Sequence, residues 1–555
     1  MPQPIKIALA QLNFHVANFD YNLKKIIENI ELAIAEKTDI IVFPELAVCA
    51  YPPRDFLEFN FFINRCQQII IEIAKSSQDI AIIIGAPTYN KTGRGKKLHN
   101  SAFFLSDGEI KHIYNKGLLP TYDVFDEFRY FEPAQSFEVV HYKGHKIALT
   151  ICEDLWDEET EDLDGDGMLN KTYSITPMEI LMKQNPDLII NIAASPFDYT
   201  HAIERKKVLC RNAAKYKLPL VYVNHVGAQT ELIFDGGSAI INANGEITNE
   251  AKYFEEQLMV VELFNKPQTI EIQIEKTEIE TIYNALLLGV SDFFKKMNFG
   301  KAILGLSGGI DSALVCALAA KALGADNVHA VLLPSKYSSE HSILDALKLV
   351  ETLGISHQIL PIQETVDAAE KTLSETFMGM NSGLAEENLQ ARTRAILLMA
   401  ISNKFGYILL NTSNKSEAAV GYGTLYGDMC GGLSVIADLY KTQVYELCNF
   451  INKEMEIIPK NTIVKAPSAE LRPNQKDSDS LPDYDLLDKV LFQYIEKRKG
   501  PDELIAQGFD EALVQRITKL VNANEFKRHQ TPPILRVSPK SFGMGRRMPI
   551  VAKYN

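Results

Sequence analysis

The sequence predicts an α/β protein of two units, the first with a mixed sheet and the second with a parallel, doubly wound sheet. Short apolar runs alternate with amphipathic stretches through the first half of the chain, which is typical of α/β folds. A strand, a glycine-rich turn, a helix and a second strand follow one another near residues 301–333, as in parallel units. The length of 555 residues also exceeds a single domain of about 100 to 200 residues.

The first half contains six apolar, β-rich runs that we expect to form strands. They are residues 5–14, 39–44, 80–85, 146–151, 188–192 and 220–223. Apolar residues recur at helical spacing over 22–36 and 61–76, which predicts amphipathic helices. Asp-Gly at 107–108 and Asn-Gly at 244–245 lie between apolar arms and predict hairpins. Hairpins add antiparallel strands, so the predicted sheet is mixed.

The helical and strand periodicity breaks between about residues 262 and 280. We therefore divide the chain into a first unit over 1–262, a linker over 263–280 and a second unit over 281–555. In the second unit we expect a strand at 301–306, a helix at 312–323 and a strand at 328–333, with a ligand at the carboxyl ends of the strands. Residues 466–485 and 528–549 are rich in Pro, Ser and charge and are predicted to be loops.

Composition and charge exclude several kinds of protein. Hydrophobic residues at 46% and charged residues at 23% are typical of a globular chain rather than a disordered or fibrous one. The formal net charge of -14 provides no overall positive field for nucleic acid. We find no secretory signal and no apolar run of about 20 residues, so we expect a cytoplasmic protein without a membrane partner. Seven cysteines without a CxxC pair indicate neither a disulfide scaffold nor a zinc ribbon.

Three reactive side chains in the first half follow predicted strands: Glu45, Lys116 and Cys152. A thiol attacks a carboxamide carbon once a base removes its proton, and a lysine can lower the thiol pKa and stabilise the oxyanion. A buried structural cysteine is the alternative for Cys152. The Glu153-Asp154 pair that follows it is unsuited to an apolar core, so we favour the reactive thiol.

Motifs in this half resemble the nitrilase superfamily of carbon–nitrogen hydrolases. They are FPELAVCAYPPRD at 43–55, YNKGLLPTYDVFDEFRYFEP at 114–133 and ICEDLW at 151–156. The resemblance implies an α-β-β-α sandwich in which Glu45 is the general base, Cys152 the nucleophile and Lys116 the group that stabilises the tetrahedral intermediate. Water would then hydrolyse the thioester. The residues implied for the glutamine site are Tyr122, Glu127 (which also supports the triad), Ser195 and His201.

Two features depart from this resemblance. His201 stands where a lysine would be expected to meet the substrate carboxylate, and a histidine is a weaker, pH-dependent partner. A surface histidine is the alternative. The insertion at 157–173 carries an Asp-x-Asp-x-Asp-Gly run at 162–167 that mimics the start of a calcium loop. Tyr173 occupies the twelfth position, where a bidentate glutamate belongs, so we favour a solvated acidic loop.

A glycine-rich turn, GLSGGIDSA at 305–313, lies between an apolar strand and an apolar helix of the second half. Small residues let backbone N–H groups converge on an anion, and the helix N-terminus adds positive charge. We therefore expect a phosphate cradle, formed by Ser307, Gly308, Gly309 and Ser312. The GxxxxGK[ST] pattern of a Walker A loop is absent. A tight turn without a ligand is the alternative, which the strand and helix context disfavours.

This turn resembles that of the ATP pyrophosphatases, which cleave ATP between the α- and β-phosphates and activate a carboxylate as its adenylate. The resemblance implies ATP as co-substrate and Mg²⁺ bound by Asp311. We choose Glu417 as the second metal ligand, with a helix-start acid favoured by the helix dipole as the alternative. The residues implied for ATP are Gly305, Leu306, Ser307, Gly308, Gly309, Ile310, Asp311, Ser312 and Thr412.

Further motifs match the NAD synthetases. They are LLPSKYSSEHSILDA at 332–346, EENLQARTRAILL at 386–398, NTSNKSE at 411–417, APSAELRPNQKDSDSLPDYDLLD at 466–488, KRHQTPP at 527–533 and FGMGRRMPI at 542–550. The joined halves thus resemble the glutamine-dependent NAD synthetases over nearly the whole chain. Contacts with deamido-NAD are implied at Asn388, Glu417 and Lys527. Looser candidates, with solvated surface charges as the alternative, are Arg394, Lys415, Lys476, Arg546 and Arg547.

The resemblance implies a glutamine-hydrolysing carbon–nitrogen ligase that forms NAD from deamido-NAD, with AMP and pyrophosphate as further products. It also implies a homo-oligomer, commonly an octamer. Free ammonia is mostly protonated near neutral pH, so we expect a dry passage between the two sites. Another ATP pyrophosphatase amidotransferase and a nucleotide-binding protein with inactive sites are the alternatives. Amide hydrolysis without ATP would leave the second half unused.

Overall fold

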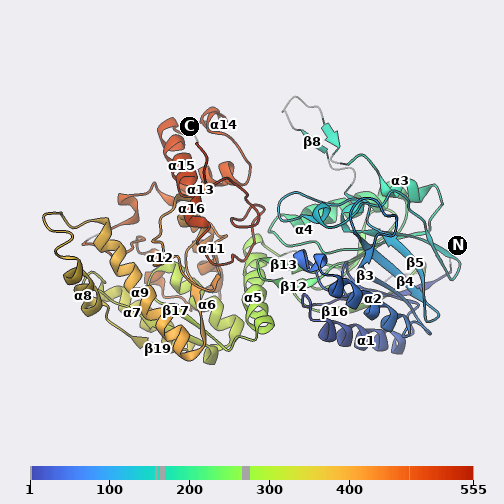
Figure 1. The fold of residues 1–555 in the computed structure, drawn as a ribbon, viewed down its shortest axis with the longest axis horizontal. Helices are drawn as coiled ribbons and strands as arrows, with labels where there is room; N and C mark the ends of the chain where they lie inside the picture. Colours follow the sequence, from blue (N-terminus) through green and yellow to red (C-terminus); the bar gives the residue numbers. More distant parts are fainter. Residues whose placement is uncertain are drawn as a thin grey trace. The chain divides into compact units, whose positions relative to one another are not determined.

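The computed structural model describes residues 3–156, 160–162, 169–171, 173–265, 276–473 and 475–553. The chain divides into two compact units, Met1–Glu275 and Lys276–Asn555 (Figure 1). Most of the predicted linker at 263–280 and of the acidic insertion at 157–173 lies outside the described residues. Among the residues that are described, none of the helices combines the length and apolar character that crossing a membrane would require.

The first unit contains two mixed six-stranded sheets, as the hairpins and apolar runs predicted. The first has the order β16-β1-β2-β3-β4-β5 and the second β15-β14-β11-β10-β7-β6. Parallel pairs lie in the centre of each sheet and antiparallel pairs toward the edges. The strands are β1 (Ile5–Gln11), β2 (Ile40–Val42), β3 (Ala81–Tyr89), β4 (Leu98–Ser106), β5 (Glu109–Asn115), β16 (Gln257–Leu263), β6 (Val140–Tyr142), β7 (His145–Ile151), β10 (Leu188–Ile192), β11 (Leu220–Val223), β14 (Ala239–Ile241) and β15 (Ile247–Glu250).

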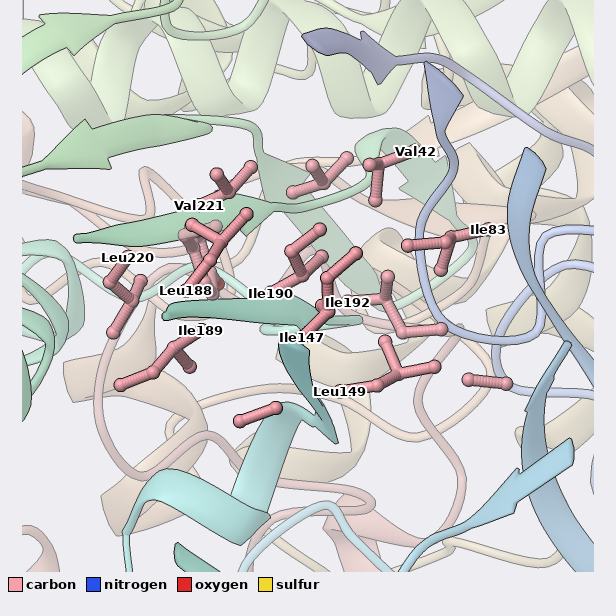
Figure 2. Close-up of a cluster of buried hydrophobic side chains, with 14 of the residues drawn as sticks. Val42, Ile83, Ile147, Leu149, Leu188, Ile189, Ile190, Ile192, Leu220 and Val221 are labelled. Carbon is pink, nitrogen blue, oxygen red and sulfur yellow. The ribbon is translucent and has the colours of Figure 1, made fainter. Parts of the chain in front are cut away.

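The inner faces of the two sheets share one hydrophobic core. Val42 and Ile83 of the first sheet lie toward Ile147, Leu149 and Ile190 of the second (Figure 2), and all five are fully buried. Burial of one such side chain contributes about 1.5 to 3 kcal/mol. Helix α2 packs on β3, and α4 packs on β11 and β14. The helices of this unit are α1 (Phe19–Ala35), α2 (Asn60–Ala74), α3 (Pro177–Met182) and α4 (His201–Tyr216).

The predicted hairpin at 107–108 is present between β4 and β5. Asp107 and Gly108 both have positive φ angles, of 55° and 77°, as the two central residues of a type I′ turn require. The predicted strand at 80–85 runs on to Tyr89, because β4 pairs with its full length. The described part of the unit also contains two short antiparallel pairs: β8 (Thr160–Asp162) with β9 (Leu169–Lys171), and β12 (Val226–Gln229) with β13 (Leu232–Asp235).

The second unit is built on a five-stranded sheet of order β19-β18-β17-β20-β21 in which all pairs are parallel. The strands are β17 (Lys301–Gly305), β18 (Val328–Leu332), β19 (Ser356–Ile359), β20 (Tyr407–Asn411) and β21 (Leu433–Ser434). The chain moves outward in one direction from β17 and then in the other from β20. In doubly wound sheets, this reversal opens a crevice at the carboxyl ends of the two central strands. The predicted doubly wound fold is confirmed.

The helices of the second unit place its glycine-rich turn. Helix α6 starts at Ile310, two residues before the predicted start at 312, so Asp311 lies in its first turn. Most side chains of α6 are buried, which follows from its nearly continuous apolar sequence. The helices are α5 (Glu278–Met297), α6 (Ile310–Leu323), α7 (Glu340–Leu353), α8 (Gln363–Leu373), α9 (Leu384–Phe405), α10 (Lys415–Val420), α11 (Lys441–Ile451), α12 (Lys460–Val464), α13 (Tyr484–Ile495), α14 (Pro501–Ala506), α15 (Glu511–Ala523) and α16 (Glu525–Arg528).

Candidate active sites

Cys152 lies directly after β7, and its backbone has a φ of 42°. Non-glycine residues seldom adopt this left-handed conformation, and where they do the surrounding structure holds them there, often at functional sites. A short 3₁₀ turn, η3 (Cys152–Leu155), begins at the same residue. The thiol is therefore presented on a sharp turn at a strand end.

Lys116 lies between two carboxylates in the interior of the first unit. Its Nζ is 2.6 Å from Oε1 of Glu45 and 2.9 Å from Oε1 of Glu127. All three side chains are buried. Asn100, which no sequence motif identified, donates to Glu45 Oε1 at 2.6 Å and to Glu127 Oε2 at 3.3 Å. The backbone N–H of Ala194 donates to the other Glu45 oxygen at 2.9 Å, so the position of Glu45 is fixed.

The charges around Cys152 suit a thiol that needs a base. Burial raises the thiol pKa well above its ordinary value, Glu45 raises it further, and Lys116 opposes them. Burial lowers the pKa of Lys116, but Glu127 and Glu45 outweigh it and keep the pKa well above its ordinary value. The resting state thus pairs a protonated thiol with a cationic lysine. A nearby carboxylate must accept the thiol proton before attack, and Glu45 has that chemistry.

Three of the residues predicted for glutamine take part in two polar pairs, one of them with Glu153. The Tyr122 hydroxyl donates to both Glu153 oxygens, at 3.0 and 3.1 Å, and burial, followed by the charge on Glu153, raises the pKa of Tyr122 well above its ordinary value. Ser195 Oγ lies 2.9 Å from Nε2 of His201. His201 is half-buried, starts α4 and stacks on Trp156 with ring centroids 5.3 Å apart. The histidine is therefore held by contacts on two sides, and its contact with glutamine stays a prediction.

Glu153→Gln should weaken the pH dependence of stability. Burial raises the pKa of Glu153 from its ordinary 4.5 to about 7. Because the folded-state pKa exceeds the unfolded value, the stabilisation is full below about pH 4.5 and is lost as the pH rises through about 7. We expect the fall in unfolding free energy between pH 5 and pH 8, measured by urea denaturation, to shrink by about 2 to 3 kcal/mol. Glu138→Gln, at an exposed position, should leave that fall unchanged, and equal behaviour of both variants would contradict the prediction.

The second site is a cavity of about 340 Å³ at the carboxyl ends of β17 and β20. Thr412, directly after β20, and Glu417 line it. The residues of the predicted turn that line it are Gly305, Leu306, Ser307, Gly309, Ile310, Asp311 and Ser312. Gly308 is not part of the lining. Its φ is 78°, and a Cβ there would lie 2.1 Å from the Ser342 carbonyl oxygen of α7, so only glycine fits.

Two serine hydroxyls shape the turn. Ser307 and Ser312 have their Oγ atoms 3.1 Å apart, and the backbone N–H of Gly309 donates to Ser307 Oγ at 3.2 Å. Gly309 is also the N-cap of α6, which provides a helix N-terminus beside the cavity. Backbone N–H groups and a helix N-terminus favour an anion such as phosphate.

An acidic pair lies beside the turn. Asp311 accepts from Asn414 Nδ2 at 2.9 Å, and its other oxygen is 2.5 Å from Nζ of Lys441. Lys441, which no motif identified, is also 3.5 Å from Glu417. Burial, and next the charge on Asp311, raise the pKa of Glu417. Within the described ranges, His, Cys, Asp and Glu side chains form no group of three or more that could hold a metal ion unaided.

The structure places two of the predicted deamido-NAD residues outside the cavity lining. Lys527 donates to the carbonyl oxygens of Gly421 and Gly423 at 2.7 and 2.9 Å. Asn388 accepts from the Thr424 hydroxyl at 2.7 Å. Both residues therefore contact the loop at 421–428, and Tyr422, Gly427 and Asp428 of this loop line the cavity.

The looser candidates occupy different environments. Arg394 lines the cavity and donates to the Leu333 carbonyl oxygen at 3.0 Å. Lys476 and Arg547 are exposed, and Arg546 pairs with Glu525 at 2.5 Å. The surface-charge alternative is wrong for Lys415, which is 0% exposed. Its Nζ contacts Glu496 Oε1 at 2.8 Å, Asp438 Oδ1 at 3.0 Å, Ser538 Oγ at 2.7 Å and the Lys540 carbonyl oxygen at 3.0 Å.

Lys415→Met should destabilise the second unit by about 3 to 5 kcal/mol, because it leaves the buried carboxylates of Asp438 and Glu496 without their cation. Urea denaturation followed by circular dichroism measures the change. Lys476→Met, at an exposed lysine, should change the free energy of unfolding by no more than about 0.5 kcal/mol. A Lys415→Met protein as stable as Lys476→Met would contradict a role of this ion cluster in stability.

Fold and sites together define a carbon–nitrogen hydrolase unit joined to an NAD synthase unit. The carbon–nitrogen hydrolase family matches residues 6–161, and the NAD synthase family matches 282–531. A glutamine-dependent NAD(+) synthetase from Synechocystis is 45% identical over 557 residues, which cover 99% of both chains. A glutamine-dependent NAD(+) synthetase from Acinetobacter baylyi is 41% identical over 552 residues, which cover 98% of both chains. The solved structure of a glutamine-dependent NAD+ synthetase from Acinetobacter baumannii with adenosine diphosphate, 38% identical, has a TM-score of 0.78 over 99% of both chains.

The chain therefore belongs to the glutamine-dependent NAD(+) synthetases and is an enzyme of NAD synthesis. The resemblance drawn from the motifs of both halves is confirmed. The family covers the nitrilase-type first unit as well as the synthase unit, because the relatives match over nearly the full length.

Proposed function

We propose that the enzyme amidates deamido-NAD to NAD with ammonia released from glutamine, and that it converts ATP to AMP and pyrophosphate. Glutamine hydrolysis is assigned to residues 1–262 and NAD formation to residues 281–555. The observation that carries the proposal is the presence, in one chain, of the thiol site around Cys152 and the glycine-rich turn that lines a cavity. The names of the full-length relatives support the dependence on glutamine.

In the first reaction, Glu45 accepts the thiol proton as Cys152 attacks the carboxamide carbon of glutamine. Lys116 stabilises the oxyanion that forms, a role in which one donor contributes about 10² to 10³ in kcat. Ammonia leaves with the proton returned by Glu45, and water then hydrolyses the thioester to glutamate. The polar pairs around Tyr122 and His201 supply groups that can bind the amino and carboxylate groups of an amino acid.

In the second reaction, the nicotinate carboxylate of deamido-NAD attacks the α-phosphate of ATP and pyrophosphate leaves. Ammonia then displaces AMP from the adenylate. Backbone N–H groups of the turn and the N-terminus of α6 bind phosphate oxygens, and the cation of Lys441 lies beside them in the cavity lining. Asn388 and Lys527 would influence deamido-NAD binding through the loop at 421–428, or would contact deamido-NAD directly after a shift of that loop.

The acidic pair suits Mg²⁺. Asp311 and Glu417 offer carboxylate oxygens, and Mg²⁺ usually takes one or two carboxylates with substrate phosphates and water. The pKa of Glu417 is raised by burial and by Asp311, so a cation in addition to Lys441 would stabilise the ionised pair. When bound there, Mg²⁺ would neutralise charge on the phosphates of ATP.

The test is to incubate the enzyme with glutamine, ATP, MgCl₂ and deamido-NAD and to quantify all products by liquid chromatography. NAD, AMP, pyrophosphate and glutamate should appear together, with one AMP for each NAD. Formation of ADP in place of AMP would contradict the proposal, and unchanged deamido-NAD would favour the alternative of another ATP pyrophosphatase amidotransferase. The dry passage for ammonia and the homo-oligomer stay predictions.

A further inference from the structure

We propose that Asp154 is a positioning residue that sets the geometry between Cys152 and Lys116. Its side chain is 0% exposed, and each carboxylate oxygen accepts two hydrogen bonds. The donors are the backbone N–H groups of Gly117 (2.9 Å), Leu118 (2.9 Å) and Ile151 (3.0 Å) and the hydroxyl of Tyr114 (2.9 Å). Such a residue contacts no reacting atom and acts through the two residues that do.

The donors flank both reactive side chains. Gly117 and Leu118 directly follow Lys116, and Ile151 directly precedes Cys152. Lys116 leaves β5 of the first sheet, whereas Cys152 leaves β7 of the second sheet. One buried carboxylate therefore joins the two strand ends that carry the cation and the thiol, although the strands belong to different sheets.

Two backbone carbonyl groups of the Cys152 turn are held from its own side of the sandwich. Asn191 on β10 donates to the Cys152 carbonyl oxygen at 3.4 Å, and Asn212 on α4 donates to the Leu155 carbonyl oxygen at 2.9 Å. These amides hold the turn against the second sheet and its helix. Two side chains of the turn contact the segment that follows β5. Asp154 Oδ1 bonds the two residues directly after Lys116, whereas Glu153 accepts from Tyr122, which lies farther along that segment. The distance to Lys116 is therefore set most directly through Asp154.

Only a carboxylate satisfies this arrangement, since the four partners are all donors. An asparagine has one acceptor oxygen, and its NH₂ group would face N–H and O–H donors. The segment after Lys116 has little room to move, because a Cβ at Gly117 would lie 2.6 Å from the Phe137 ring. Burial raises the pKa of Asp154 to about 6, with the hydrogen bonds opposing the rise, so the group is ionised at pH 8.

Asp154→Asn provides the test, which rests on the proposed glutamine hydrolysis at Cys152. We expect the kcat of glutamine-dependent NAD formation to fall about 100-fold at pH 8, the scale of a 1 Å misplacement of reacting groups. Synthesis from ammonium chloride should stay within about twofold, since it needs only the second unit. The matched control is Asp187→Asn: Asp187 also accepts a β7 backbone N–H, from Lys146 at 2.9 Å, but at the far end of the strand. It should keep both activities within about twofold.

Alkylation of the Cys152 thiol separates positioning from a loss of stability. The charged groups that face the thiol are Lys116, Glu45, Glu127 and Glu153. Lys116 is the cation among them, so its displacement should raise the midpoint of the pH profile of iodoacetamide reaction by about one unit. The profile is measured against Cys152→Ala as the background for the remaining cysteines. Asp187→Asn should keep the midpoint of the unsubstituted enzyme.

The inference is overturned if Asp154→Asn keeps the glutamine-dependent kcat and the alkylation midpoint of Asp187→Asn. If Asp154→Asn does not fold, Tyr114→Phe decides. Loss of this single hydrogen bond should lower the kcat about three- to tenfold and move the midpoint upward, and an unchanged kcat and midpoint would overturn the inference. Failure of the proposed function can be distinguished from failure of this inference. If the proposed function were wrong, Cys152→Ala would retain glutamine-dependent synthesis.

Discussion

Cys152→Ala is expected to abolish glutamine-dependent NAD formation, by a factor of about 10⁴ or more, and to leave ammonium-dependent formation within about twofold. Without the thiol no thioester forms, and neither Glu45 nor Lys116 can replace the nucleophile. The glycine-rich turn and its cavity belong to the other unit. The measurement is NAD formation at saturating deamido-NAD and ATP, with either glutamine or ammonium chloride as the nitrogen source.

The matched control for this prediction is Cys210→Ala. Cys210 lies on α4 in the same unit and is half-buried, and it takes no part in the proposed chemistry. Both activities of this variant should equal those of the unsubstituted enzyme. Loss of both activities in Cys152→Ala would argue against two separable sites, and retention of the glutamine-dependent activity would refute the nucleophile.

Asp311→Asn should lower NAD formation from either nitrogen source by about 10² to 10³. The change removes one carboxylate of the acidic pair and leaves Lys441 with Glu417 at 3.5 Å as its remaining carboxylate in the cavity. We expect glutamine hydrolysis, assayed as glutamate formation, to persist. The dependence on Mg²⁺ concentration should shift upward, because the amide is a poorer ligand for a hard cation than the carboxylate.

Asp326→Asn is the control for the acidic pair. Asp326 is an exposed aspartate in the turn that follows α6, at the opposite end of the helix from Asp311. Its substitution should change neither the rate of NAD formation nor the Mg²⁺ requirement. An Asp311→Asn enzyme that matched Asp326→Asn in both measurements would refute the assignment of Asp311 to the nucleotide site.

Local sequence patterns are sufficient to predict the helices and strands and the reactive residues that follow strand ends. Cys152 and the turn after β17 each come directly after a run of apolar residues, and the carboxyl ends of buried parallel strands meet at one sheet edge. The type I′ hairpin at 107–108 required only the Asp-Gly pair and its apolar flanks. Lys116 was predicted from its position after such a hairpin arm. These features depend on a few neighbouring residues, so the sequence alone identifies them.

The partners of those residues could not be predicted in the same way. Lys441 is 130 residues from Asp311, and Asn100 is 55 residues from Glu45. Their contacts exist only because the sheet order brings separate strand and helix ends together. Lys415 resembles any surface cation in the sequence, and its burial depends on carboxylates contributed by distant segments. Long-range pairs of this kind leave no local signal.

The stacked pair at the start of α4 has a practical consequence. Trp156 is the one tryptophan among the 555 residues, and its indole lies flat against the His201 imidazole, with an angle of 2° between the ring planes. The indole emission of the whole enzyme therefore originates beside His201, which contacts Ser195 and is predicted for the glutamine site. Fluorescence titration with glutamine can therefore follow this part of the first unit without a label.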